Sequence, residues 1–277
     1  MPFLAKRRNR FWVTPILTGG LTEIKLNGIR VNMRQLIETW RGGSASFSWL
    51  ASAPYTCYKM AYTAADKHQA RALLTAHFSK FQKKCRFSIE LGGTPPKPGE
   101  GSVIVYNETS FIDTIAYGVC MWPHVDRGAL TDLYALVPFA RAALRKANVE
   151  MVPRGNRVGT DRLLKRMVSA VEAGERLAWG GEGRIHGQDG VGRFKVGSSL
   201  IAIRAQVPLV PVVFHGGHQI MPLRSIRARP GTVHVRFGEP ISTVGMHEDN
   251  ARDLADHLQN EASQIYANLK KLTSLPQ

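Results

Sequence analysis

The sequence predicts an α/β fold in which a central, mixed but mostly parallel sheet is flanked by helices. From residue 58 onward, apolar strand-like runs alternate with segments of helical pattern. Such alternation is typical of a parallel sheet with helices packed on its faces. A helical or irregular N-terminal extension at residues 1–57 precedes this predicted domain, which occupies residues 58–277.

The first expected elements are one long helix and two strands. Apolar residues at helical spacing predict an amphipathic helix over 58–81. Residues 87–91 alternate between apolar and polar side chains, as a strand does, and a Gly- and Pro-rich loop follows at 92–99. The apolar run 102–106 suits a buried strand, and residues 113–117 begin the next helix.

The later elements continue the alternation. Residues 140–147 consist of Ala, Leu, Arg and Lys, which favour a helix, and 149–152 is a candidate strand. A helical pattern over 161–173 ends at Gly174, which suits a C-cap. The remaining expected elements are strands at 176–179, 207–214 and 232–237 and helices at 194–205 and 250–272.

The N-terminal 57 residues allow two interpretations. Glycine pairs interrupt short apolar pieces, so no long element is evident. Aromatic and basic residues are mixed near the start, as in segments that dock on a membrane interface. These residues are Phe3, Arg7, Arg8, Arg10, Phe11 and Trp12. An ordinary packed N-terminal arm explains the same composition, and both interpretations stay open.

The chain is strongly basic, with 37 Lys and Arg against 21 Asp and Glu and a net charge of +16. This charge favours anionic partners such as an anionic membrane surface, a phosphorylated substrate or an acidic carrier protein. The basic residues lack the spacing of known nucleic-acid-binding modules, so we expect no nucleic-acid partner.

Cysteine usage and hydropathy indicate a cytoplasmic protein. Cys57, Cys85 and Cys120 are scattered and odd in number, which indicates a reducing compartment and argues against a disulfide framework or a metal site. No apolar run approaches the length of a membrane-spanning helix. The basic residues 6–10 and the short run 11–17, which contains Pro15, do not form a convincing export signal. We expect peripheral association with the inner face of the cell membrane.

Residues that carry chemistry follow directly after the 102–106 run. Asn107 ends the apolar strand, and Glu108 and Asp113 bracket four residues at the start of the expected helix. Further short motifs follow in order: V-P-R-G-N-R at 152–157, G-G-E-G-R at 180–184, F-K-V-G at 194–197, V-P-L-V-P-V at 207–212 and V-R-F-G-E-P-I at 235–241.

In this order, the motifs resemble those of the PlsC-type lysophospholipid (1-acylglycerol-3-phosphate) acyltransferases, which are N-H-x-S-x-x-D, I-D-R-x-x-R, F-P-E-G-T-R, F-K-x-G and V-P-I-V-P-V. The resemblance covers roughly residues 85–245. It implies that a general base deprotonates a hydroxyl of a lipid acceptor, which then attacks an acyl thioester. The implied co-substrate is acyl-CoA or acyl carrier protein thioester, with no bound cofactor and no metal.

The resemblance assigns site residues one by one, with departures at important positions. The implied catalytic residues are Glu108 and Asp113, and the implied substrate-binding residues are Asn107, Ser110, Arg154, Glu182, Gly183, Arg184 and Lys195. Glu108 stands at the position of the catalytic His. Arg184 stands at the Thr of the third motif and Ile185 at its Arg, which puts phosphate contact there in doubt. Gly180 and Gly181 replace Phe-Pro, which we expect to widen the pocket.

Three hypotheses account for Glu108. A carboxylate with a pKa near 4.3 is a weak base, but burial beside Asp113 would raise that pKa toward about 6 to 7. Alternatively, His186, His215 or His218 supplies the base, the last two lying in a glycine-containing turn after the fourth motif. In the third hypothesis, the chain is an inactive relative that binds lipid or carrier.

The changed motifs also leave the transferred group and the acceptor open. Transfer of an acyl group to a lipid acceptor at the membrane surface is the first interpretation. Carrier-dependent transfer of a glycyl or aminoacyl group to lipid A, or acylation of an aminolipid, is the alternative.

Overall fold

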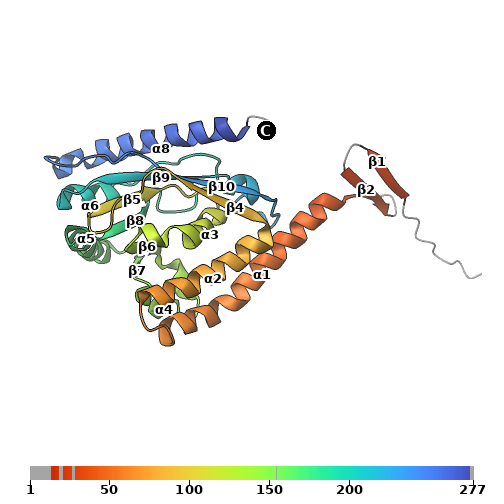
Figure 1. Ribbon diagram of the computed structural model, residues 1–277, viewed down its shortest axis with the longest axis horizontal. Coiled ribbons are helices and arrows are strands. Elements are labelled where there is room, and N and C mark those ends of the chain that lie inside the picture. Colours follow the sequence, from red (N-terminus) through yellow and green to blue (C-terminus); the bar gives the residue numbers. More distant parts are fainter. Residues whose placement is uncertain (1–13, 19–20, 27–28, 154, 275–277) are drawn as a thin grey trace, which may run out of the picture.

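A seven-stranded sheet of order β4-β10-β9-β5-β8-β6-β7 forms the centre of this computed structural model (Figure 1). The structure describes residues 14–18, 21–26, 29–153 and 155–274. The strands are β4 (Phe87–Gly92), β5 (Ser102–Tyr106), β6 (Arg127–Thr131), β7 (Val149–Val152), β8 (Arg176–Gly180), β9 (Leu209–His215) and β10 (Gly231–Phe237). Only the β9–β10 pair is antiparallel among the neighbours in this sheet. The predicted mixed, mostly parallel sheet is confirmed.

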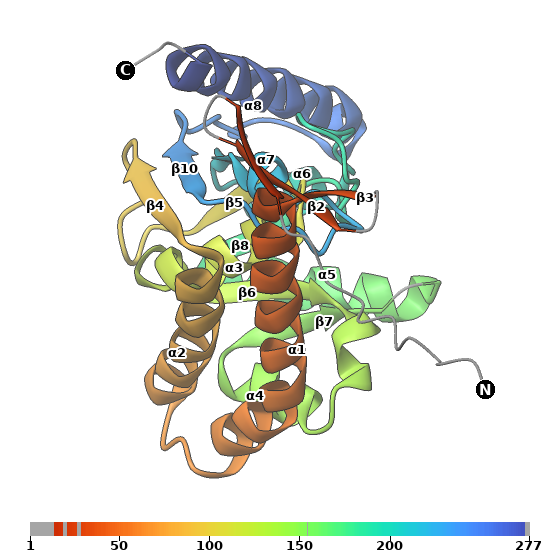
Figure 2. The same cartoon turned by 90° about the vertical axis from the view of Figure 1, so that its right-hand side faces the viewer.

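Helices cover both faces of the sheet. They are α1 (Met33–Tyr62), α2 (Lys67–Cys85), α3 (Phe111–Cys120), α4 (Ala140–Lys146), α5 (Arg157–Glu172), α6 (Gly197–Ala205), α7 (Gly217–Ile220) and α8 (Ala251–Ser274). Helices α5, α6 and α8 lie on one face, and α1, α2 and α3 lie on the other (Figures 1 and 2). Among the described helices, none has both the length and the hydropathy needed to cross a bilayer.

The central strand β5 shows how the sequence builds these two layers. All five of its residues are buried, and successive side chains of a strand point to opposite faces. Val103 and Val105 pack in the core under α5, α6 and α8, whereas Ile104 and Tyr106 pack in the core under α3. Tyr106 therefore faces the helices that form the pocket described below.

The N-terminal extension is helical from residue 33, as predicted, but strands precede this helix. A three-stranded antiparallel sheet of β1 (Thr14–Thr18), β2 (Leu21–Leu26) and β3 (Ile29–Asn32) lies at the start of α1 (Figure 1). The aromatic and basic residues noted between Phe3 and Trp12 lie outside the described residues. The boundary predicted between residues 57 and 58 falls inside α1, a helix of 30 residues.

The single helix predicted over 58–81 is wrong. The chain turns at residues 63–66, between the antiparallel helices α1 and α2 (Figure 2). Asp66 is the N-cap of α2, and its side chain accepts a hydrogen bond from the Gln69 N–H at 2.9 Å. An N-cap carboxylate satisfies one of the free N–H groups of a helix start, so it marks a boundary that apolar periodicity alone conceals. Strand β6 was also not predicted.

Candidate active site

The loop between β5 and α3 begins with Asn107, whose amide joins two strands. Asn107 is fully buried, donates from Nδ2 to the Phe214 carbonyl at 3.1 Å and accepts at Oδ1 from the Phe214 N–H at 2.8 Å. Both polar groups of the side chain are therefore bonded to the backbone of β9. This places the predicted substrate-binding Asn107 behind the loop, where it fixes the end of β5.

We expect the Asn107→Ala substitution to lower the free energy of unfolding by about 2–4 kcal/mol, because it leaves a buried N–H and a buried carbonyl of Phe214 without their partner. Urea unfolding of the purified protein measures this change. The matched control is Asn260→Ala at an exposed position of α8, which we expect to change stability by less than about 0.5 kcal/mol.

Asp113 closes the same loop from the first turn of α3. Its Oδ2 accepts hydrogen bonds from the Thr109 N–H at 2.8 Å, the Thr109 hydroxyl at 2.7 Å and the Ser110 N–H at 3.0 Å. Ser110, the N-cap, accepts at Oγ from the Ile112 N–H at 2.9 Å. These bonds form a capping box, so Ser110 and Asp113 hold the loop in one conformation.

The second oxygen of Asp113 has no hydrogen-bond partner among the described residues. It points at Gly217, where a Cβ atom would overlap it, so a glycine is required for this close approach. Asp113 is only 2 % exposed, and burial is the main cause that raises its pKa to about 6. The carboxyl is thus enclosed beneath the loop.

Glu108 lies on the other side of the loop, in a pocket that we name the polar pocket because its lining includes charged side chains. The lining of this pocket includes Glu108, Arg184, Gly183, Trp179 and Tyr134. The Glu108 carboxylate lies over Gly180, because a Cβ atom built there would be 2.8 Å from its Oε2. The structure therefore separates Glu108, which faces the pocket, from Asp113, which does not line it.

Glu182 connects the third motif to this loop. It is 4 % exposed, and its carboxylate accepts from the Glu108 N–H at 2.7 Å and from the Gly192 N–H at 2.8 Å. The space beside Gly180 is occupied by Glu108, and that beside Gly181 by the ring of Phe194. The two glycines thus accommodate neighbouring side chains, and the expected widening is not seen at Gly181.

His186 is drawn into the same cluster. Its Nε2 lies 3.2 Å from Glu182 Oε1, at ion-pair distance although without the direction of a hydrogen bond, and Glu182 raises the pKa of His186. Its Nδ1 accepts from the Gln188 N–H at 3.1 Å. Because Nδ1 accepts this bond, a neutral His186 ring carries its proton on Nε2, which faces Glu182. Neither ring nitrogen then has a free lone pair with which to act as a base on a substrate.

The other candidate histidines lie away from the polar pocket. The Nε2 of His215 is 3.1 Å from Thr273 Oγ1, and its ring packs edge-on against Tyr266 of α8 at 4.9 Å between ring centroids. His218 lies in α7, next to Gly217. Neither side chain, nor that of His186, belongs to the described lining of the polar pocket.

The remaining predicted site residues divide between the pocket rim and the undescribed part of the chain. Gly183 and Arg184 line the polar pocket and are exposed. Lys195 is exposed, and its Cγ lies near Gly183. Arg154 lies outside the described residues. The Arg184 side chain is thus available at the rim for an anionic group.

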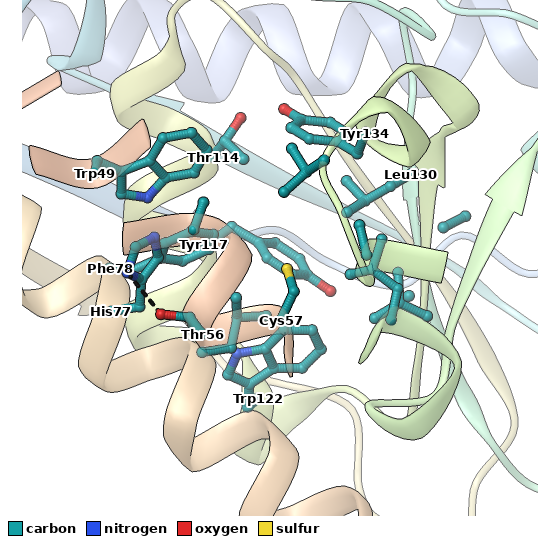
Figure 3. Close-up of a pocket in the computed structure, with 18 of the residues that line it drawn as sticks. Trp49, Thr56, Cys57, His77, Phe78, Thr114, Tyr117, Trp122, Leu130 and Tyr134 are labelled. Carbon is teal, nitrogen blue, oxygen red and sulfur yellow. Dashed lines mark hydrogen bonds between the residues drawn. The ribbon is translucent and has the colours of Figure 1, made fainter. Parts of the chain in front are cut away.

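An apolar pocket adjoins the polar pocket, between the sheet and helices α1 and α2 (Figure 3). The two pockets share the side chains of Tyr106, Ala129, Leu130 and Tyr134. Burial first, and the Glu108 charge second, raises the pKa of Tyr134 to about 12 and that of Tyr106 well above its usual range. The charge of the Glu108 carboxylate therefore acts on both shared tyrosines.

Neither Tyr134 nor the apolar pocket could be predicted from the sequence. Its lining comes from segments spread between α1 and β7, and no local pattern joins these segments. For Tyr106, a signal existed, because it is the last residue of a buried strand directly before the Asn107–Asp113 motif.

Part of this chain is similar in sequence to a known protein family and to known proteins. Residues 88–215 match the family described as Acyltransferase. A putative 1-acyl-sn-glycerol-3-phosphate acyltransferase, acl-2, of Caenorhabditis elegans is 27 % identical over 158 residues, which are 56 % of this chain and 55 % of that protein. The 1-acyl-sn-glycerol-3-phosphate acyltransferase alpha of Mus musculus is 32 % identical over 74 residues, 26 % of each chain. The chain thus spans about half the length of the first relative and about a quarter of the second.

The fold has a solved counterpart. The crystal structure of the 1-acyl-sn-glycerophosphate acyltransferase PlsC from Thermotoga maritima matches with a TM-score of 0.64 at 18 % identity, covering 86 % of this chain and 97 % of that one. The family match includes the Asn107–Asp113 loop, Glu182 and strand β9. Residues 88–215 are therefore similar to the Acyltransferase family, and the chain shares its fold with PlsC.

Proposed function

We propose that the chain transfers an acyl group from a thioester, either acyl-CoA or acyl carrier protein, to a lysophospholipid-type acceptor at a membrane surface. The observation that carries this proposal is the junction of the two pockets. Glu108 belongs to the lining of the polar pocket, and Tyr106 and Tyr134 line both this pocket and the adjoining apolar pocket, which is the proposed site of the acyl chain. Apolar pockets with a few convergent polar groups are typical ligand sites.

In the proposed reaction, the acyl chain occupies the apolar pocket and the thioester carbonyl lies near Glu108. The Glu108 carboxylate accepts the proton of the acceptor hydroxyl as the hydroxyl oxygen attacks the carbonyl carbon. The carbon–sulfur bond then breaks, and the proton passes to the departing thiolate. The products are an ester of the acceptor and a free thiol.

The other site residues have positioning roles in this proposal. Asp113, Ser110 and Asn107 hold the loop that presents Glu108, and Glu182 fixes the Glu108 N–H. Arg184, at the rim, is placed to pair with an anionic headgroup by charge-assisted hydrogen bonds.

The direct test incubates the purified chain with acyl-CoA and acyl-loaded carrier protein, together with hydroxyl and amine lipid acceptors, and determines the masses of the lipid products. Thiol release with a matching acylated lipid supports the proposal. A glycylated or aminoacylated product, or bound lipid with no thioester consumed, would favour the alternative activities instead.

Helix α1 carries a surface that supports the proposed membrane contact. Leu36, Trp40, Phe47 and Leu50 follow helical spacing along one side of α1 and are 50–77 % exposed. With Lys84 of α2, three of these residues line a shallow groove. An exposed apolar stripe with nearby cationic side chains fits an anionic bilayer.

We expect the double substitution Trp40→Ser and Phe47→Ser to weaken binding to vesicles that contain anionic phospholipid by about 100-fold, because two large aromatic side chains would no longer enter the interface. Vesicle co-sedimentation measures the effect. Leu272→Ser, at a 64 % exposed position of α8, is the control. An equal loss of vesicle binding in the control variant would show that α1 is not the docking surface.

A further inference from the structure

Four of the side chains that line the apolar pocket carry a buried polar atom that has no partner within the described part of the chain. These atoms are Trp49 Nε1, His77 Nε2, Tyr117 Oη and Trp122 Nε1. Tyr117 is 9 % exposed and His77 is 6 % exposed, so neither side chain reaches bulk solvent readily. Polar groups buried in this way are costly unless they are hydrogen-bonded.

The hydrogen-bonding capacity of His77 can be assigned. Thr56 Oγ1 donates its single proton to the Ser52 carbonyl at 3.0 Å and lies 3.2 Å from His77 Nδ1. Both bonds form at once only when His77 Nδ1 carries the proton of the second bond. Burial lowers the pKa of His77 to about 4, so the ring is neutral near pH 7 and its Nε2 is an acceptor.

The unpartnered groups thus include both donors and an acceptor. The indole nitrogens of Trp49 and Trp122 can only donate, and Tyr117 Oη can do both. The rings of Trp49 and His77 are 5.4 Å apart between centroids, and Figure 3 shows the Trp49 nitrogen on the side of His77. A donor and an acceptor on neighbouring rings match a hydroxyl group, which can accept from one and donate to the other.

Tyr117 connects these groups to the reacting end of the pocket. Its ring lies 5.2 Å from the ring of Tyr106, which belongs to both pockets. Its hydroxyl lies beside Gly128, where a Cβ atom would be 3.4 Å away, and Gly128 precedes Ala129 of the shared wall. An unsubstituted alkyl chain at this place would offer these groups no hydrogen bond.

We propose that the apolar pocket selects an acyl chain that bears a hydroxyl group, and that Tyr117 and Trp49 are specificity-determining residues for it. This inference rests on the proposed acyl transfer, since it names the class of acyl group that is transferred. The hydroxyl is bound by the lining groups and takes no part in the chemical step.

The test compares acyl donors of equal length that are unsubstituted, hydroxylated near the carboxyl end or hydroxylated near the methyl end. We expect the wild type to use one hydroxylated donor roughly tenfold or more better in kcat/KM than the unsubstituted donor. In Tyr117→Phe and Trp49→Phe, we expect this preference to fall severalfold. Tyr62→Phe, at a 63 % exposed position of α1, is the matched control and should retain the preference.

A second measurement separates this inference from the proposed function. Displacement of a fluorescent fatty acid by free hydroxylated and unsubstituted fatty acids reports pocket preference without catalysis. Tyr117→Phe should also raise the Tm of the unliganded protein, because it removes a buried hydroxyl that lacks a partner. If transfer fails while the binding preference persists, the proposed function is wrong and the pocket assignment stands. Equal use and equal binding of all donors by the wild type would overturn the inference.

Discussion

The Glu108→Gln substitution is expected to lower kcat/KM for acyl transfer by about 10²- to 10⁴-fold, the usual contribution of a general base. Glutamine preserves the size of the side chain but cannot accept the proton of an acceptor hydroxyl. Initial rates of thiol release, measured with the acyl donor and acceptor identified by product mass, give the effect directly.

The fold should survive this substitution. The bonds that Glu108 makes with Glu182 and His186 use its backbone N–H and carbonyl, which are unchanged in the variant. Equal circular dichroism spectra and Tm values would verify this. Glu100→Gln, at an exposed loop position, is the matched control. Full transfer activity in the Glu108 variant would exclude Glu108 as the base.

The Glu108→His substitution distinguishes an altered enzyme from an inactive relative. It introduces the histidine that the PlsC-type motif has at this position. The loop that carries it is already held by Asn107, Ser110 and Asp113. In an acyltransferase scaffold we expect retained or altered transfer. A wild type and a His variant that both bind lipid but consume no thioester would support the binding-protein hypothesis.

Local patterns predicted most of the sheet, whereas boundaries that depend on single side chains were missed. The strands around 102–106 and 176–179 are short apolar runs and were placed nearly to the residue. The break between α1 and α2 depends on the Asp66 cap, and the helical spacing of apolar residues continues across this break. Strand β6 contains Gly128 and has neither an apolar run nor a clear alternation, which explains why it was not predicted.

The candidate site was predictable where its residues are neighbours in sequence. Asn107, Ser110 and Asp113 belong to one loop, and the resemblance to known motifs placed Glu182 beside it. The sequence did not show where the two carboxylates point. Glu108 points into the polar pocket, whereas Asp113 points beneath the loop toward Gly217. That difference arises from the capping box, which directs one Asp113 oxygen to Thr109 and Ser110. The role of Glu108 as the general base thus remains a prediction. For Asp113, we propose a positioning role.

The burial of Asp113 should be visible in the pH dependence of stability. Its pKa rises from the usual 3.8 to about 6 in the folded protein, mainly because burial disfavours the charged carboxylate. The folded state therefore binds a proton more tightly than the unfolded state. The resulting stabilisation is full below about pH 4, is lost as the pH rises through about 6, and amounts to about 3 kcal/mol.

The Asp113→Asn variant lacks this titration while it retains an oxygen that can accept from Thr109 and Ser110. We expect the free energy of unfolding of the variant, relative to the wild type, to increase by about 3 kcal/mol between about pH 4 and about pH 7. Urea unfolding across this range measures the difference. Asp253→Asn, at an exposed position of α8, is the control and should follow the wild-type curve. Parallel curves for Asp113→Asn and the wild type would show that the pKa of Asp113 is not raised in the folded protein, because the hydrogen bonds from Thr109 and Ser110 then offset its burial.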